Sequence, residues 1–438
     1  MLPKPLSLVF CLLIFAIFVS LPVNPPSIAQ SAGEEERVSR MGSGDANFDV
    51  YTLDSIANLM TGWRPSLVID PKTNHPYISY ANSNGEIMLA YPVTANGNCG
   101  PNNTWKCTAV AQYITGGHSS IDIYYNPDSQ FWRLGIVYRR DTAMLNYITT
   151  TNLSSWEMET ISSSTAINVS IGKSATLKYD SQGIAHVSYY HENNNTGLTD
   201  ALKYAKRVNG NCGTGNKWTC AEIDSGEGVG AASEMDMIGD TPLIAYYDEG
   251  NTDLLFAQYI GSVGPYPCGP DNFWSCITYD TNGGADPSIA AKGGLRIAYH
   301  NESNGYLQMF VGPIYPIDHM GNVAGKDQGL RVRVTSSHQH VMVYSRLRGD
   351  DQDVVIARPY QDEGLSQGNC GLINGSYRYH CATIDSLSGH DMGRFLDAEV
   401  NKFNQVVVAY TDEVGSVMSL KVGVERLKTI YLPLVVKP

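Results

Sequence analysis

An apolar segment that ends in tyrosine recurs seven times along this chain, and it constrains the fold more than any other feature. The copies are YISYANSN (Tyr80), LGIVYRRD (Tyr138), HVSYYHEN (Tyr189), LIAYYDEG (Tyr246), RIAYHNES (Tyr299), VMVYSRLR (Tyr344) and VVAYTDEV (Tyr410). From Tyr80 to Tyr410, six steps cover 330 residues, a mean of 55 per step. A repeat of this length with strand-like alternation predicts a β-propeller or β-solenoid rather than helical repeats. The first unit reads as four strands (SLVID, PYISY, IMLAY and WKCTAV), so we expect an all-β, seven-bladed propeller of four-stranded antiparallel blades.

A second signature marks the fourth strand of each unit and bears on how the ring closes. Its best copies read W-x-C-x-x-I-D-S from Trp218 to Ser225 and, with tyrosine first, from Tyr379 to Ser386. A further copy, Phe48 to Ser55, precedes the first full unit. An outer strand at the N-terminus has no blade of its own, so we expect it to complete the last blade and remove an open sheet edge. The fifth unit is the weakest, because no such copy follows Tyr299.

Eight of the nine cysteines form four close pairs in similar contexts, NCGPNNTWKC, NCGTGNKWTC, PCGPDNFWSC and NCGLINGSYRYHC. An even count in similar loops predicts four local disulfides, Cys99–Cys107, Cys212–Cys220, Cys268–Cys276 and Cys370–Cys381. Zinc is the alternative, but the spacing does not match a CxxC knuckle and no histidine recurs beside the pairs. We expect the tryptophan two residues before the second cysteine to cover each bridge, and the recurring tyrosines to pack between blades.

The N-terminus predicts export. Lys4 precedes an apolar stretch, Leu6 to Val23, followed by small residues where a signal peptidase cleaves. An uncleaved membrane anchor is the alternative, because the stretch is near the lower length limit for spanning. We expect a signal peptide over residues 1–29, a flexible linker over 30–46, the propeller over 47–426 and a short tail over 427–438. The protein is thus predicted to be secreted, extracellular or held at the cell surface.

Composition excludes some partners. A chain with 43% hydrophobic and 17% charged residues can bury a core, and its formal net charge of -13 does not suit wrapping nucleic acid, which needs a basic surface. Anionic lipid repels such a chain as well, so a membrane enters only through an uncleaved anchor. Nucleophile elbows, phosphate-binding loops and HExxH are all missing from the sequence, which argues against the corresponding hydrolases.

The units resemble a known group of proteins. SLVIDPKTNHPYISY, TLKYDSQGIAHVSYYHEN and the LIAYYDEG core are similar to the SLxxDxxGxPxISYYD repeats of exported bacterial propellers, which are distantly sialidase-like (BNR). The resemblance covers about 380 of the 438 residues and implies the fold rather than an activity. The sialidase motif S-x-D-x-G-x-x-W is not present as such, so no catalytic residue carries over. The last residues also resemble short tails of exported bacterial proteins, with a final β-strand as the alternative.

Strand parity locates the candidate site. In a four-stranded meander, the loops after the tyrosines and the links between blades share one face, where loops on a rigid scaffold commonly carry function. The candidate ligand-binding residues on that face are Arg64, Arg139, His191, Glu192, Asp248, Glu249, His300, Glu302, Arg346 and Arg394. The same links also bring Trp63, His118, His390 and Asp391. The plain alternative is that these charges form a solvated rim.

These residue types suggest three kinds of chemistry. Arginines are suited to hold a carboxylated sugar through bidentate contacts. Asp248 with Glu302 suits glycosidic acid/base chemistry at a separation of ~5–10 Å, and His191 or His300 beside a tyrosine suits proton abstraction as in a lyase. No cofactor is expected; calcium enters only as an alternative at Asp248 to Asp253 or Gly349 to Asp353, which offer oxygen ligands without EF-hand spacing.

Two function classes follow. The first is a non-catalytic exported propeller that binds a ligand or partner, most plausibly a surface glycan, on the face after the tyrosines. The second is an enzyme acting on polysaccharide, either a sialidase-like hydrolase or a lyase. The first is favoured, because the chain is rich in aromatic residues and carries no complete catalytic motif.

Overall fold

The computed structural model describes residues 46–55, 61–115, 117–195, 199–319, 329–363 and 365–426. The chain divides into two units, Met1–Arg37 and Val38–Pro438, and every described residue belongs to the second unit. The predicted signal peptide, nearly all of the linker and the C-terminal tail lie outside the described residues and stay predictions. In the described part, no helix is long and apolar enough to cross a membrane.

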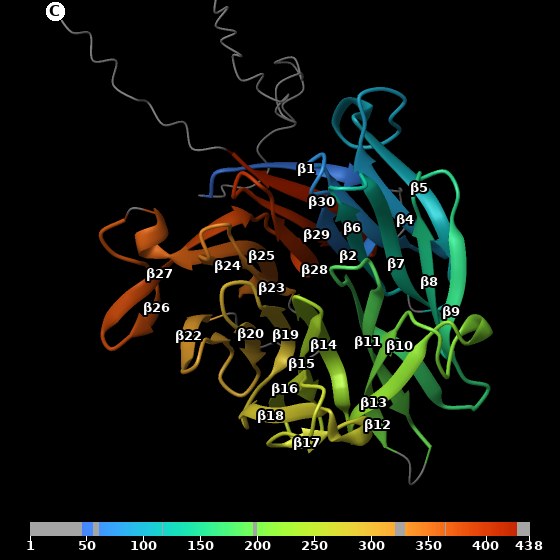
Figure 1. Ribbon diagram of the computed structural model, residues 1–438. Coiled ribbons are helices and arrows are strands. Elements are labelled where there is room, and N and C mark those ends of the chain that lie inside the picture. The colour runs from blue at the N-terminus through green and yellow to red at the C-terminus, as the bar shows by residue number, and fades with distance from the viewer. Residues whose placement is uncertain are drawn as a thin grey trace, which may run out of the picture. The chain divides into compact units, whose positions relative to one another are not determined.

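Five sheets each follow a four-stranded antiparallel meander (Figure 1). The first holds β2 (Thr61–Ile69), β3 (Pro76–Asn82), β4 (Glu86–Pro92) and β5 (Trp105–Gln112). The second holds β6 (Ser119–Asn126), β7 (Phe131–Asp141), β8 (Met144–Thr150) and β9 (Glu157–Ser163). The third holds β10 (Val169–Tyr179), β11 (Ala185–Asn193), β12 (Asp200–Lys206) and β13 (Thr219–Gly226). The fourth holds β14 (Val229–Ile238), β15 (Thr241–Asp248), β16 (Asp253–Tyr259) and β18 (Trp274–Asp280), with the short β17 (Pro267–Cys268) beside β18. The fifth holds β19 (Ala285–Ala290), β20 (Arg296–Asn301), β21 (Tyr306–Phe310) and β22 (Ile314–His319).

The remaining strands form one nine-stranded sheet. One part runs β23 (Leu330–Val334), β24 (His340–Arg348), β25 (Asp351–Pro359) and β27 (Ser376–Asp385), with β26 (Cys370–Ile373) beside β27. The other part runs β28 (Asp391–Val400), β29 (Val406–Val414), β30 (Val417–Glu425) and β1 (Phe48–Asp54). Four short 3-10 turns, η1 (Pro101–Asn103), η2 (Thr214–Asn216), η3 (Pro270–Asn272) and η4 (Tyr360–Glu363), complete the described elements.

The prediction of four-stranded antiparallel blades is confirmed, but the count of seven separate blades is wrong for the sheets as they hydrogen-bond. Five sheets stand alone, and the last two groups of strands are merged. The physical reason is local, because β25 and β28 begin at the same end and one parallel pair, Gln352 with Asp391, joins them. The weak fifth unit nevertheless forms four strands, with β22 as an outer strand that lacks the tryptophan and cysteine signature.

The first described strand pairs with the last one. β1 pairs antiparallel with β30, from Phe48 opposite Glu425 to Asp54 opposite Leu420. Leu53 is buried among the side chains of the first sheet, in one apolar cluster with Leu67 and Trp105. The two ends of the described propeller are thus adjacent through β1 and β30.

The recurring tyrosines connect successive sheets. All seven side chains are at most 1% exposed, as expected for packing between blades. Five of them also donate a hydrogen bond to an aspartate on the preceding outer strand, and the pairs are Tyr80–Asp54, Tyr246–Asp224, Tyr299–Asp280, Tyr344–Asp318 and Tyr410–Asp385. The aspartate of the I-D-S signature therefore serves to hold the next sheet, a role that the sequence alone did not reveal.

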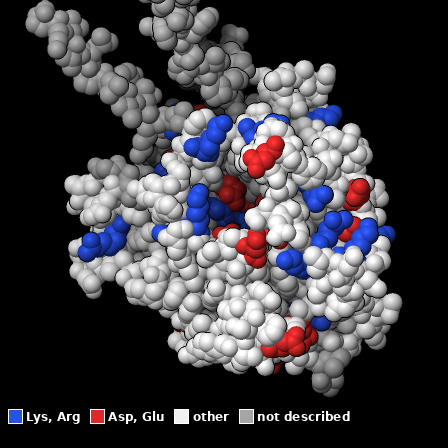
Figure 2. Space-filling view, in the orientation of Figure 1, with Lys and Arg blue, Asp and Glu red and all other residues white. Residues whose placement is uncertain are grey.

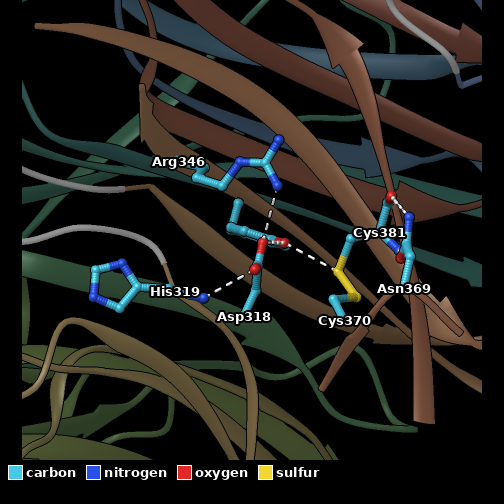
Figure 3. The surroundings of a disulfide bond; sticks show 7 residues. Asp318, His319, Arg346, Asn369, Cys370 and Cys381 are labelled. Atoms are coloured by element: carbon cyan, nitrogen blue, oxygen red, sulfur yellow. Dashed lines mark hydrogen bonds and ion pairs between the residues drawn. A yellow bond between two sulfur atoms is a disulfide. The ribbon is translucent and has the colours of Figure 1, made fainter. Parts of the chain in front are cut away.

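The four predicted disulfides are all present. Each of the tryptophans Trp105, Trp218 and Trp274 packs in an apolar cluster with its own bridge, which confirms the covering role. The glycine after the first cysteine is needed for this packing: Gly100 has a φ of 69°, and a Cβ there would lie 2.7 Å from the Trp105 ring. In the hairpin of the Cys370–Cys381 bridge, the asparagine before the first cysteine adds two bonds: the Asn369 side chain exchanges two hydrogen bonds with the backbone of Cys381 (Figure 3).

Candidate functional site

The innermost strand of every unit faces one central cavity of about 400 Å³. Residues at or beside β2, β6, β10, β14, β19, β23 and β28 line it. Figure 2 shows basic and acidic side chains gathered at the hollow in the middle of one face of the molecule. The basic lining residues are Arg64, Lys173, Lys178, Arg331, Arg333 and Arg394, and the acidic ones are Glu234, Asp286, Asp397 and Glu399. A protein of net charge -13 thus has a cavity in which basic groups outnumber acidic ones.

Side chains inside the cavity tie each inner strand to the next. A hydroxyl or carboxylate on one strand accepts a hydrogen bond from a backbone N–H of the following strand. The pairs are Ser66 with Ile121, Ser120 with Leu177, Glu234 with Ile289, Ser288 with Val332, and Asp397 with Leu67. Between β10 and β14 the direction differs, because the Ser174 hydroxyl donates to the Ala231 carbonyl and the Ser233 hydroxyl to the Ser174 carbonyl. These polar side chains are therefore part of the scaffold.

Deeper in the cavity, buried charges neutralise each other. Arg333 contacts Glu234 at 3.1 Å, Asp397 at 3.0 Å and Glu399 at 2.9 Å. Burial alone raises the pKa of Asp397, but Arg331 and Arg333 outweigh it and hold that pKa below its ordinary value. For Glu399 burial wins over the attraction of Arg333, and the pKa is raised. Because these ions satisfy one another, the deep part of the cavity is structural rather than a vacant binding site.

A recurring distortion of the backbone shapes the entrance. Inner strands β2, β10 and β19 each contain a non-glycine residue of positive φ, namely Arg64 (48°), Ser174 (50°) and Asp286 (48°). The strand register shifts at the same places, between Trp63 and Ser66 and between Lys173 and Thr176 for example. Such bulges redirect side chains, and non-glycine residues rarely adopt this conformation without a reason. Here the three residues of positive φ all line the cavity.

We call Arg64, Lys173 and Arg394 the cationic mouth. The guanidinium carbons of Arg64 and Arg394 lie 4.6 Å and 5.3 Å from the centroid of the same Phe395 ring. Lys173 lines the cavity from β10 and contacts Glu192 at 2.6 Å. Arg394 also lies 3.5 Å from Glu413. Arginines stacked on an aromatic face are held in place, and the planar guanidinium suits recognition of a planar anion such as a carboxylate.

The positive charge at the entrance affects the protonation of a nearby histidine. Burial lowers the pKa of His118 well below its ordinary value, and Arg64, Arg139 and Lys173 lower it further. His118 is therefore neutral at pH 7 and adds a polar, uncharged group to the cavity lining. Arg139 lies behind the entrance: it is 7% exposed and donates a hydrogen bond to the Asp141 carbonyl.

The structure thus brings together part of the predicted site and separates the rest. Arg64 and Arg394 both stack on Phe395 at the cationic mouth. Glu192 pairs with Lys173 of the mouth, and Arg139 lies close enough to lower the pKa of His118. Lys173 was missed by the sequence analysis. It follows Gly172 directly, as His118 follows Gly117 and Arg394 follows Gly393, and these three glycines all have positive φ. A recurring glycine in the N-terminal half of the inner strand, or just before that strand, is the signal that would have found Lys173.

The other predicted residues do not line the cavity. The Asp248 carboxylate holds its own turn by accepting bonds from the Asn251 backbone and side chain. Glu302 accepts a hydrogen bond from the Tyr247 hydroxyl at 2.9 Å, between the fourth and fifth sheets. Arg346 pairs with Asp318 at 3.2 Å, next to the Cys370–Cys381 bridge (Figure 3).

Three predicted residues remain. His191 lies on β11, and burial lowers its pKa. His300 is 6% exposed on β20, and Glu249 is exposed in the turn after β15. The two segments considered for calcium hold carboxylates that already have protein partners, since Asp353 pairs with Arg348 at 3.1 Å. Within the described ranges, no group of three or more histidine, cysteine, aspartate or glutamate residues is arranged to hold a metal ion.

Comparison with known proteins finds only distant similarity. No protein-family model matches the chain, and no curated protein matches it in sequence. Among solved structures, it is similar to a fucose-specific lectin from Aleuria aurantia, with 11% identity over 77% of this chain and 99% of that chain and a TM-score of 0.43. It is similar to the polysaccharide lyase Uly1, with 10% identity over 83% and 90% and a TM-score of 0.44. It is also similar to a sialidase from Trypanosoma rangeli, with 10% identity over 74% and 56% and a TM-score of 0.38.

The class of the protein follows from its own sheets. The chain is an all-β β-propeller with four-stranded antiparallel blades and four disulfides. The sequence family suggested by the SLxxDxxGxPxISYYD-type repeats has no support from the sequence comparisons.

Proposed function

We propose that this protein is an exported, non-catalytic glycan-binding propeller that takes an acidic saccharide at the cationic mouth of its central cavity. The observation that carries the proposal is the convergence of Arg64, Lys173 and Arg394 on one entrance of a chain that is otherwise strongly acidic. Two guanidinium groups stacked on Phe395 suit the carboxylate of a uronic or sialic acid. The partner is accordingly a free or cell-surface glycan rather than a nucleic acid.

Export is part of the same proposal. Four disulfides favour an oxidising compartment, and the apolar stretch at residues 1–29 reads as a signal peptide. The domain boundaries are proposed as residues 30–46 for a linker, 47–426 for the propeller and 427–438 for a tail.

The nine-stranded sheet, in this proposal, acts as two adjoining blades. A single parallel pair joins its halves, whereas full antiparallel ladders run within each half. Two hydrogen bonds support β1 as the strand that closes the ring: the Leu67 backbone N–H donates to Asp397, and the Tyr80 hydroxyl donates to Asp54. The cavity is then enclosed by seven inner strands, and the mouth draws its cations from three of them.

The second candidate function is a polysaccharide-active enzyme, either a sialidase-like hydrolase or a lyase. The Tyr247–Glu302 pair favours it, because a hydroxyl beside a carboxylate is a common acid/base arrangement. Burial and Glu302 both raise the pKa of Tyr247, so the hydroxyl is protonated at neutral pH. The pair lies away from the residues that line the cavity, which is why binding is preferred.

Calorimetric titration of the full chain with carboxylated and neutral polysaccharides tests the proposal. The carboxylated set is polygalacturonate, alginate, hyaluronan and polysialic acid, and dextran is the neutral reference. We expect binding to at least one carboxylated polymer, weakening as salt rises because the cations are partly exposed. The double variant Arg64→Ala, Arg394→Ala is expected to weaken it by about a hundredfold or more, at about 1.5–3 kcal/mol per charged hydrogen bond.

Arg378→Ala is the matched control, because Arg378 is an exposed arginine on β27 that does not line the cavity. Equal weakening by the control, or no binding to any carboxylated polymer, would reject the proposed site. Release of unsaturated or shortened saccharides that is lost in Tyr247→Phe would instead establish the enzyme.

A further inference from the structure

A second cleft lies at the other end of the inner strand that carries Arg64. It has a volume of about 860 Å³ and is open to solvent. Three turns surround it: the turn after β2 (residues 70–73), the turn between β6 and β7 (129–131) and the turn after β8 (151–153). Because Arg64 begins the cavity-facing part of β2 and Asp70 follows its end, the cleft is separated from the cationic mouth by the length of that strand.

Aromatic rings form the wall of this cleft. Tyr77 stacks on Tyr91 with ring centroids 5.5 Å apart and contacts Trp132 at 6.0 Å. Phe131, at the edge, is 37% exposed, and the Trp132 side chain is only partly buried. Within the part of the chain that the structure describes, the Trp132 indole N–H donates no hydrogen bond to another protein group. Ligand sites are lined mainly by aromatic and apolar side chains with a few polar groups, and a partly exposed aromatic wall with a tryptophan N–H has that composition.

The rim is polar but nearly uncharged. The Asp70 carboxylate is 2% exposed and already accepts bonds from the Lys72 backbone N–H and the Thr73 hydroxyl. The Lys72 ammonium lies 5.7 Å from the Tyr125 ring. Ser129 and Thr151 present exposed side chains at the edge. Such a rim offers hydroxyl groups and one cation, and it lacks the paired arginines that an acidic sugar needs.

The turns around the cleft are held in place before any ligand arrives. The Asn126 side chain accepts bonds from the backbone of residues 128 and 129, and the Asn152 side chain accepts bonds from residues 154 and 155. Gln130 and Leu153 adopt positive φ values of 55° and 61° in these turns. A rim fixed in this way loses little conformational entropy on binding.

We propose that this cleft is a second, independent binding site for a neutral saccharide, with a pyranose ring stacked on Trp132 and its hydroxyls at the polar rim. A pyranose has an apolar face of C–H groups and an equatorial belt of hydroxyls. The first matches the indole face, and the second matches the hydroxyls of Ser129 and Thr151 and the indole N–H. The site takes uncharged sugars, whereas the cationic mouth takes carboxylated ones.

Titration of the full chain with neutral hexasaccharides of glucose, mannose, galactose and xylose tests this site. We expect at least one of them to bind and to change tryptophan fluorescence. Trp132→Ala is expected to raise its Kd about tenfold or more, and Trp132→Phe, which keeps a ring, to raise it about threefold. Thr151→Arg, which fills the rim without touching the aromatic wall, is expected to abolish binding even if Trp132→Ala does not fold.

The controls separate this site from the cationic mouth. Tyr266→Ala removes a 65%-exposed ring outside the cleft and is expected to leave neutral binding unchanged, as is Arg64→Ala with Arg394→Ala. Binding of no neutral hexasaccharide at millimolar concentration overturns the proposal, as does binding that survives both Trp132→Ala and Thr151→Arg. Either result leaves the test of the cationic mouth unaffected, because that test uses carboxylated polymers and different variants.

Discussion

Replacing Tyr246 by phenylalanine removes one of the hydrogen bonds that join successive sheets. The Tyr246 hydroxyl donates to Asp224 at 2.7 Å, from β15 to the outer strand β13 of the preceding sheet. The only other bond that the Asp224 carboxylate accepts within the described ranges comes from the Ser225 backbone at 2.9 Å. Tyr246→Phe therefore leaves a half-buried carboxylate with one partner instead of two.

The cost follows from the charge of the acceptor. A hydrogen bond to an ionised group contributes about 1.5–3 kcal/mol to stability, roughly twice a neutral one. We expect Tyr246→Phe to lower the free energy of unfolding by this amount at pH 7. For a propeller of about 380 residues, an unfolding entropy of about 2.1 cal/mol/K per residue converts it to a fall in Tm of about 2–4 °C by calorimetry.

The pH dependence of the variant's stability provides a second test. Burial raises the pKa of Asp224, and the bond from Tyr246 lowers it, so removing the hydroxyl raises the folded-state pKa further. A carboxyl whose folded pKa lies above its unfolded value destabilises the fold as pH rises through that window. The variant's deficit in Tm should therefore be full at pH 7 and shrink at pH 4, where the carboxyl becomes protonated.

Tyr138→Phe is the matched control. Tyr138 occupies the same place in the second sheet, but its hydroxyl meets Asn146 at 3.2 Å and the Met158 sulfur at 3.5 Å, both neutral. We expect about 0.5–1.5 kcal/mol and no dependence on pH between 4 and 7. Equal losses in the two variants, or a Tyr246→Phe deficit that does not shrink at pH 4, would refute the reasoning.

Three further predictions concern stability. Leu53→Ala should lower the free energy of unfolding by about 2–4 kcal/mol if β1 is an integral strand, and denaturation at wild-type values would show that it is not. Loss of the Cys268–Cys276 bridge should lower the free energy of unfolding by about 2.5 kcal/mol. It should also expose its loop to proteolysis more than loss of the Cys99–Cys107 bridge does, because the Asn98 side chain still bonds the backbone of Cys107 in the latter loop. Equal proteolysis rates would contradict this. Burial, with a smaller effect of Arg296, lowers the pKa of His340 to about 4. The free energy of unfolding should therefore fall as pH drops below about 6.5, by about 2 kcal/mol at pH 5. The Tm of His340→Gln should fall less between pH 7 and pH 5 than the Tm of the wild type.

The sequence predicted those parts of the fold that local chemistry determines. Strand alternation and the tyrosine period located the strands, and the paired cysteines located the four bridges. It did not predict the merging of the last two groups of strands, because one backbone pair between Gln352 and Asp391 leaves no trace in side-chain pattern. Nor did it assign a partner to the tyrosines, since Tyr246 and Asp224 belong to different repeats and meet only after the sheets are placed.

The candidate site was predicted in part for a similar reason. Arg64 and Arg394 were selected from the links between units, and the structure places both on Phe395. The loops after the tyrosines were expected to gather at the cavity, but Arg346 pairs with Asp318 and Asp248 holds its own turn. Polar loop residues have many local partners available, and sequence spacing does not say which of them a side chain finds first.

The bulges in the inner strands have a consequence for how this architecture can diversify. Arg64, Lys173 and Arg394 lie at the cavity entrance near these bulges, whereas the bonds to backbone N–H groups of the next inner strand come from other side chains, such as Ser66, Ser120 and Asp397. Exchanging Arg64, or the residue after Gly117, Gly172 or Gly393, would therefore alter ligand preference while the framework keeps its shape. The protein is in this sense a ready scaffold for grafting new specificities, one position at a time.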